Sequence, residues 1–143
     1  MNMNVPTWLD IAMGELGQAE YPGPEANPRI VEYLKTVFQP GDDEIAWCSA
    51  FVNWCMIKAG LQGTGLPNAR SWLNWGMKIK EPMVGCVTVF KRGSSSWQGH
   101  VAFYLDQSSE GLIHVLGGNQ GNRVSMAQYL SANLLGFRWP GNP

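Results

Sequence analysis

The segment AWCSAFVNWCMIKAG, residues 46–60, decides how this chain folds, because it is long and almost entirely apolar. Acidic residues precede it at positions 42–44, and a lysine and a glycine close it, as the helix dipole and the C-cap prefer. A membrane-spanning helix needs about 20 mostly apolar residues, so the segment predicts a buried helix. Cys48 shares one helical stripe with Val52 and Cys55, and we expect that stripe to face a sheet.

Three further helices are predicted, two before this segment and a short one after it. A first helix is predicted from Thr7 to a point before Gly17. A second is predicted from Pro28 with Asn27 as its N-cap, because proline is tolerated at the first helical position. A shorter helix is predicted over residues 69–75.

The second half of the chain is rich in valine, phenylalanine and tyrosine, which favour strands. Serine- and glycine-rich turns separate these runs. The predicted strands cover residues 84–91, 100–105, 112–116 and, with a weaker pattern, 134–139. Helices followed by antiparallel strands are typical of the α+β class. We therefore expect a single α+β domain over residues 1–143.

Composition and charge exclude several classes of protein. Of the 143 residues, 45% are hydrophobic and 15% are charged, which excludes a disordered chain. The formal net charge is −1 and the basic residues are scattered, so we expect neither nucleic acid nor a membrane surface as a partner. No lysine or arginine precedes Arg29 and no apolar block follows Met1. We therefore expect a chain that is made in the cytoplasm without a signal peptide. We also expect a monomer.

One of the three cysteines is a candidate nucleophile. Three is an odd count and a poor basis for disulfide bonds. Cys48 stands near the start of the predicted buried helix, where free backbone N–H groups and the helix dipole lower a thiol pKa from about 8.5. A small buried core residue explains Cys48 equally well from position alone. Cys55 and Cys86 lie within a predicted helix and strand, and we assign both to the core.

His100 is the candidate base. It opens a predicted strand directly after Gly99, where an imidazole can project from the edge of a sheet. A histidine there can take the thiol proton and later deliver it to a leaving amine, near its ordinary pKa of about 6.5.

The group that orients this imidazole depends on the hairpin register. A register that pairs Leu105 with Leu112 puts Asn119 on the same face as the histidine. A shorter turn puts His114 opposite the histidine instead. The first register aligns the apolar runs better and favours Asn119. Gln120 is a weaker candidate, because successive residues of a strand point to opposite faces.

Four segments together resemble the NlpC/CHAP-type papain-like cysteine hydrolases, in the compact branch found in phage lysis proteins and bacterial cell-wall hydrolases. The segments are WCSAFVNW at 47–54, ARSWLNWG at 69–76, GHV at 99–101 and LGGNQ at 116–120. The resemblance runs over about residues 8–139. It implies a papain-like fold with N-terminal helices packed on a C-terminal antiparallel sheet.

The resemblance also implies an activity and roles for residues. The implied substrate is peptidoglycan, cleaved at an amide bond by a stem-peptide endopeptidase or an N-acetylmuramoyl-L-alanine amidase. Cys48 would be the nucleophile, His100 the base and Asn119 the orienting residue. In the NlpC branch the third residue is often a histidine on the next strand, which suits His114. Cys86 departs from the pattern, since such proteins usually carry aspartate there.

Further expectations concern the substrate and partners. Trp47, Trp72 and Trp97 lie near the expected groove, and Arg70 can meet a stem-peptide carboxylate. We expect no cofactor and no metal. The resemblance implies a chain that is deployed as a phage endolysin or a bacterial antibacterial effector, with an immunity or export partner protein in the second case. It reaches the wall after release by a holin or a secretion system.

Two other functions compete with this hypothesis. Cys48, His100 and His114 form an acceptable ligand set for a zinc-dependent amidase. The seven tryptophans also suit a non-catalytic cell-wall-binding module.

Overall fold

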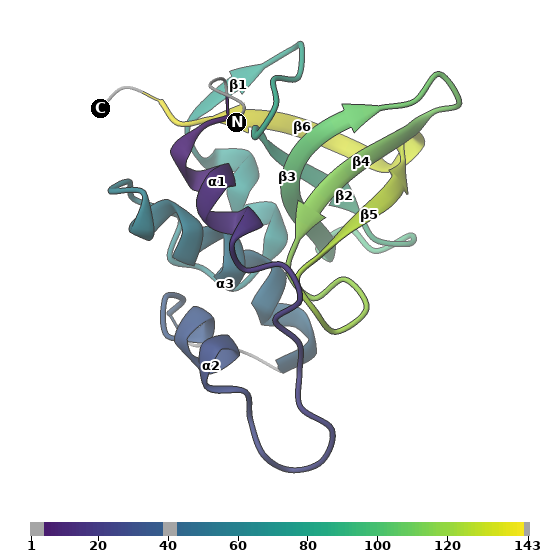
Figure 1. The fold of residues 1–143 in the computed structure, drawn as a ribbon. Helices are drawn as coiled ribbons and strands as arrows, with labels where there is room; N and C mark the ends of the chain where they lie inside the picture. The colour runs from purple at the N-terminus through teal and green to yellow at the C-terminus, as the bar shows by residue number, and fades with distance from the viewer. Residues whose placement is uncertain (1–4, 39–42, 142–143) are drawn as a thin grey trace.

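The computed structural model describes residues 5–38 and 43–141, in which helices precede a β-sheet (Figure 1). The helical elements are α1 (Thr7–Met13), α2 (Pro28–Leu34), α3 (Asp43–Lys58) and the 3-10 helices η1 (Ala69–Asn74) and η2 (Ser131–Asn133). The strands are β1 (Met77–Ile79), β2 (Val87–Lys91), β3 (Gly99–Gln107), β4 (Leu112–Gly117), β5 (Ser125–Leu130) and β6 (Leu134–Trp139). The predicted α+β class is confirmed.

Helix α2 begins for the reason that the sequence predicts. The Asn27 side chain accepts a hydrogen bond from the backbone N–H of Arg29 at 2.9 Å, and Pro28 occupies the first helical position. Helix α3 begins at Asp43, so Cys48 is its sixth residue. No helix in the described part of the chain is long and apolar enough to cross a membrane.

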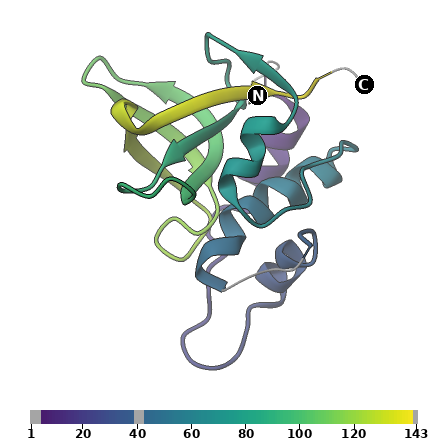
Figure 2. The same cartoon turned by 180° about the vertical axis from the view of Figure 1, so that it is seen from behind.

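The six strands form one antiparallel sheet in the order β1-β6-β2-β3-β4-β5. Figures 1 and 2 show the helices on one side of this curved sheet, with α3 next to β3. The sequence analysis missed β1 and β5. Strand β1 is only three residues long, and β5 directs Met126 and Leu130 outward, so its apolar residues do not mark a buried face.

The predicted register of the hairpin between β3 and β4 is wrong. Phe103 pairs with Leu116, whereas Asp106 pairs with His114, because the register shifts between Tyr104 and Asp106. A bulge inserts an extra residue into one strand and changes every pairing beyond it. Leu105 therefore does not pair with Leu112.

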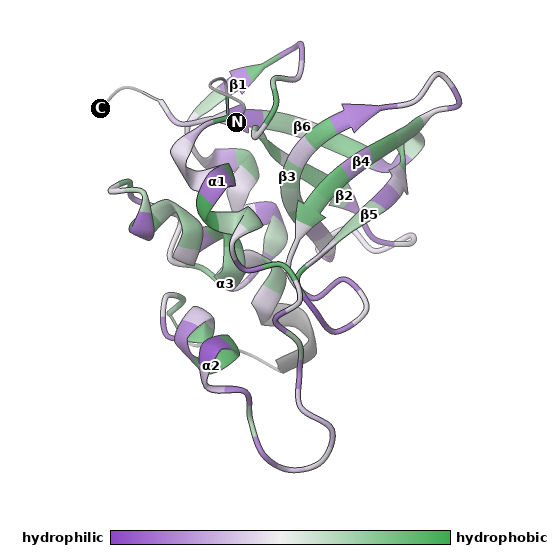
Figure 3. Ribbon diagram, in the orientation of Figure 1, coloured by the Kyte–Doolittle hydropathy of each residue, from purple (hydrophilic) through white to green (hydrophobic). Residues whose placement is uncertain are grey.

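Both faces of the sheet are buried, which explains why its central strands are almost continuously apolar. One face packs on α1, α3 and η1, while α2 packs on α3. The core on this side includes Trp8, Leu9, Tyr33, Trp47, Phe51, Val52, Trp54, Val87, Val101, Phe103 and Leu116. The other face encloses a second core of Cys86, Phe90, Ala102, Tyr104, Ile113, Val115 and Phe137. Figure 3 shows the hydrophobic colouring along the central strands. His100 belongs to the second face, since it alternates with Val101 along β3.

Candidate active site

A small pocket lies where α3 meets the ends of β2 and β3. Its volume is about 240 Å³. Cys48 from α3 and His100 from β3 both line it, which brings together the two residues that the sequence analysis paired. The remaining lining residues are Phe90, Lys91, Arg92, Gly93, Asn119, Tyr129 and Asn133.

Two contacts fix the imidazole of His100. Its Nε2 lies 2.8 Å from Oε1 of Gln120, and its ring centroid lies 4.9 Å from that of Tyr129. The Gln120 Nε2 donates to the backbone oxygen of Ser125 at 2.6 Å, so its oxygen must be the atom that faces the histidine. Because Oε1 only accepts, the neutral imidazole carries its proton on Nε2. Nδ1 is then the atom that can accept a proton.

The structure thus gives an orienting contact to Gln120, which the sequence analysis ranked below Asn119. Strand β4 ends at Gly117, and Asn119 has a left-handed backbone with φ of 57°. Because the backbone turns at Asn119, side chains beyond Gly117 no longer alternate between the two faces of a strand, and Gln120 can point toward His100. Gly117 leaves space for the Gln120 side chain, since a Cβ atom there would lie 2.7 Å from Gln120 Oε1. Asn119 itself lines the pocket.

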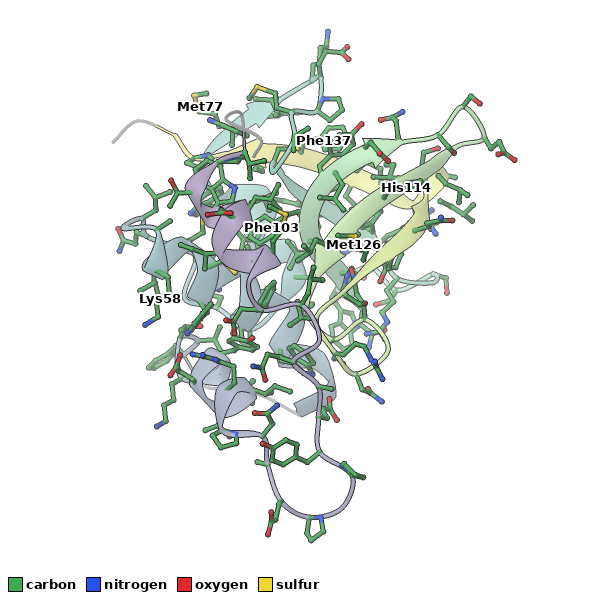
Figure 4. All side chains as sticks on the ribbon, viewed as in Figure 1. Lys58, Met77, Phe103, His114, Met126 and Phe137 are labelled. Carbon is green, nitrogen blue, oxygen red and sulfur yellow. The ribbon has the colours of Figure 1, made fainter. Side chains whose placement is uncertain are left out.

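His114 lies elsewhere on the sheet. Its Nδ1 is 2.7 Å from Oδ1 of Asp106, which is six residues beyond His100 along β3. At a rise of about 3.3 Å per residue, that separation is about 20 Å. Figure 4 shows His114 on the outer part of the sheet, away from α3. No group of three metal-ligating side chains gathers within residues 5–38 and 47–141, so the zinc ligand set of the competing hypothesis does not form.

Four of the seven tryptophans, Trp8, Trp47, Trp54 and Trp72, are buried in the core. Trp47 is 1% exposed and donates to Glu20 Oε2 at 2.9 Å, and Trp72 is 0% exposed and donates to Ser49 Oγ at 2.9 Å. The expectation that these two rings contact substrate is therefore wrong. Trp97 is exposed and lines a neighbouring pocket of about 520 Å³ together with Arg70.

Arg70 supports the loop that leads into β3. Its Nε donates to the backbone oxygen of Gln98 at 2.9 Å, and its Nη2 donates to that of Ser95 at 2.8 Å. Its Cγ lies 3.3 Å from the position of a Cβ atom on Gly99. Much of the guanidinium is thus committed to the loop before His100.

The pKa of the Cys48 thiol is raised, although we expected it to be lowered. Burial is the main cause, and the backbone N–H groups of Val101 and Ser49 and the charge of Arg92 offset it only in part. The helix dipole acts within the first turn of a helix, and Cys48 lies beyond that turn in α3. Cys55 and Cys86 are buried as predicted.

The pKa of His100 is lowered to about 4, mainly by burial. The hydrogen bond to Gln120 opposes this shift and the charge of Arg92 adds to it. At neutral pH the resting pair is therefore a thiol beside a neutral imidazole. Such a pair works by moving the thiol proton to Nδ1 as the sulfur attacks.

We predict that kcat/KM decreases as the pH is lowered through about 4, and not as it is lowered through the ordinary histidine pKa of about 6.5. The neutral imidazole is the active form, so activity is present above its pKa and is lost as the pH falls through it. The measurement is turbidity loss of cell walls from pH 3.5 to 8, with circular dichroism at each pH to exclude unfolding. An acid limb near pH 6.5 in the folded protein would contradict the prediction.

Comparison with known proteins identifies the family. Residues 40–119, more than half of the chain, match the family model of the CHAP domain. The chain belongs to the CHAP-domain family. A search of curated proteins found no match to this CHAP chain.

Solved structures show that the CHAP chain has the expected papain-like fold. One is a protein similar to a lipoprotein of the NLP/P60 family from Staphylococcus aureus, with a TM-score of 0.58 and 17% identity. Another is the wild-type endolysin LysIME-EF1, with a TM-score of 0.57 and 14% identity. The alignments cover 99% and 93% of this chain, but only 43% and 62% of those two chains.

Proposed function

We propose that this CHAP chain is a cysteine hydrolase that cleaves an amide bond of peptidoglycan. The observation that carries the proposal is that Cys48 and His100 line one pocket, with Nε2 of His100 held by Gln120. Membership in the CHAP family and the structural similarity to an endolysin support peptidoglycan as the substrate.

Acylation begins when the Cys48 sulfur attacks the carbonyl carbon of the amide. The S–C bond forms while the thiol proton moves to Nδ1 of His100. When the tetrahedral intermediate collapses, the C–N bond breaks and the imidazolium returns that proton to the leaving amine. The product is a thioester on Cys48 and a free amine.

Deacylation uses the same imidazole. Nδ1 of His100 takes a proton from water, the oxygen attacks the thioester, and the S–C bond breaks. The proton returns to the sulfur, and a carboxylic acid leaves. Gln120 does not exchange protons in either half and acts as a positioning residue, because it keeps Nδ1 directed at the reacting atoms.

The finer assignments are part of the same proposal. The cleaved bond belongs to the stem peptide, or it joins N-acetylmuramic acid to L-alanine. The exposed indole of Trp97, in the pocket that Arg70 also lines, offers a face for sugar or peptide. The chain acts on the wall as a phage endolysin released by a holin, or as a secreted antibacterial effector with an immunity partner.

The test is digestion of purified peptidoglycan followed by mass spectrometry of the fragments. We predict one new free amine per cleavage, which identifies the bond. Activity should survive EDTA and be lost after treatment with iodoacetamide, because the mechanism uses a thiol and not a zinc-bound water. Loss of activity in EDTA with restoration by zinc, or digestion products without a new amine, would overturn the proposal.

A further inference from the structure

We propose that Arg92, supported by Lys91, makes the active-site pocket selective for substrates with a free carboxylate next to the scissile amide. This inference rests on the proposed function and names a chemical feature of the substrate that the family match does not provide.

The placement of Arg92 is the first reason. Phe90 is the register partner of His100 in the pairing of β2 with β3, and Arg92 follows two residues later. Side chains two residues apart in an extended chain share a face. Accordingly Arg92 lines the same pocket as Cys48 and His100.

The charge balance of the pocket is the second reason. Its lining contains two cations, Lys91 and Arg92, and two amides, Asn119 and Asn133, but no carboxylate among the described residues. The protein as a whole carries a net charge of −1, so this concentration of positive charge is local. Guanidinium and amide N–H groups are the donors that bind a carboxylate, and arginine can do so with two parallel hydrogen bonds.

The availability of Arg92 is the third reason. Arg29 forms ion pairs with Glu15 and Glu32, and the guanidinium groups of Arg70 and Arg138 donate to backbone oxygens. Arg92 is exposed, and no described carboxylate lies within ion-pair distance of it. Its guanidinium is therefore accessible to a ligand.

A bound carboxylate would also adjust the chemistry. The charge of Arg92 lowers the pKa of both Cys48 and His100. A substrate carboxylate on Arg92 would cancel part of this field and raise the pKa of both groups.

The first experiment uses two alkylating probes of similar size, anionic iodoacetate and neutral iodoacetamide. Mass spectrometry measures the alkylation rate at Cys48 for each, and the ratio of the two rates cancels changes in thiol reactivity. We expect Arg92→Gln to lower the iodoacetate-to-iodoacetamide ratio about three- to fivefold. Arg92→Lys should keep most of the iodoacetate-to-iodoacetamide ratio, because the positive charge remains. In the unmodified protein, 0.5 M NaCl should reduce the ratio.

Lys80→Gln is the matched control, because Lys80 is an exposed cation that does not line the pocket. It should leave the ratio unchanged. An unchanged ratio in Arg92→Gln, or an equal fall in Lys80→Gln, would overturn the inference.

The second experiment compares native peptidoglycan with peptidoglycan whose carboxylates have been converted to amides with carbodiimide and ammonia. Amidation should raise KM for the unmodified enzyme about fivefold or more. Arg92→Gln should show this raised KM already on native peptidoglycan, with no further rise on the amidated form. An equal effect of amidation on both enzymes would overturn the inference.

The two proposals fail in different ways. If Cys48→Ala retains lysis, the hydrolase proposal fails and the carboxylate inference fails with it. If Cys48→Ala is inactive but Arg92→Gln changes neither the probe ratio nor KM, only the carboxylate inference fails.

Discussion

Replacing Cys48 with alanine should reduce the hydrolysis of peptidoglycan by at least about 10⁴-fold, because Cys48 is the only thiol among the described residues that line the pocket and it forms the acyl-enzyme in the proposed mechanism. The fold should survive, since alanine is only slightly smaller than the buried thiol. Release of free amines from purified walls measures the activity, and near-ultraviolet circular dichroism measures the packing of the aromatic residues.

The other two cysteines provide matched controls. Cys55 and Cys86 are buried and do not line the pocket, so Cys55→Ala and Cys86→Ala should lower stability modestly and retain activity. Binding of Cys48→Ala to walls without hydrolysis would separate catalysis from recognition. Full lysis by Cys48→Ala would instead favour the hypothesis of a non-catalytic wall-binding module aided by a contaminating hydrolase.

The second large effect concerns Gln120. Gln120→Ala should lower kcat by about 10- to 100-fold with little change in KM, because the imidazole of His100 loses the acceptor that fixes its tautomer and orientation. The comparison is Asn119→Ala, which removes a neighbouring amide that lines the pocket but leaves that acceptor in place. An equal or larger kcat loss in Asn119→Ala would show that Gln120 is not the orienting residue.

Gln120→Glu supplies a readout that a purely structural role would not produce. A carboxylate can still accept from Nε2 of His100, but its negative charge raises the pKa of the imidazole. The acid limb of kcat/KM should therefore move upward from about pH 4. The carboxylate cannot donate to the backbone oxygen of Ser125, so we also expect a lower melting temperature. An unshifted acid limb in a folded Gln120→Glu protein would contradict the assignment.

The sequence predicted those elements whose signals are local. Asn27 and Pro28 mark the start of α2 because capping depends on neighbouring residues. The strand predicted over residues 84–91 forms β2 over Val87–Lys91, where four of the five residues are buried. Cys48 and His100, which the sequence analysis combined as nucleophile and base, line the same pocket.

The features that the sequence did not predict depend on long-range geometry. The bulge between Tyr104 and Asp106 shifts the hairpin register and has no signature in the residues that form it. Gln120 reaches His100 only because Asn119 turns the backbone and Gly117 leaves space. The two adjacent glycines before Asn119 were the available signal, since they indicate a close approach of chains.

The expectation of a lowered Cys48 pKa failed for a related reason. Sequence position indicates where a helix dipole acts, but the free energy of burying a charge depends on the surroundings in three dimensions. Val101 and Ser49 supply backbone N–H groups to the sulfur, and burial still outweighs them.

Gly118 lies so close to α3 that a Cβ atom there would meet Cβ of Phe51 at 2.7 Å and Cζ3 of Trp47 at 2.9 Å. The helix that carries the nucleophile and the turn that carries the histidine's acceptor are therefore closely packed, because the backbone of Gly118 lies directly against the fully buried side chains of Phe51 and Trp47. The loop on the other side of the pocket, residues 92–98, is held by Arg70, whose side chain donates hydrogen bonds to the backbone oxygens of Ser95 and Gln98. The side of the pocket that carries Cys48 and Gln120 is therefore held by buried packing, whereas the 92–98 side is held by side-chain hydrogen bonds to its backbone.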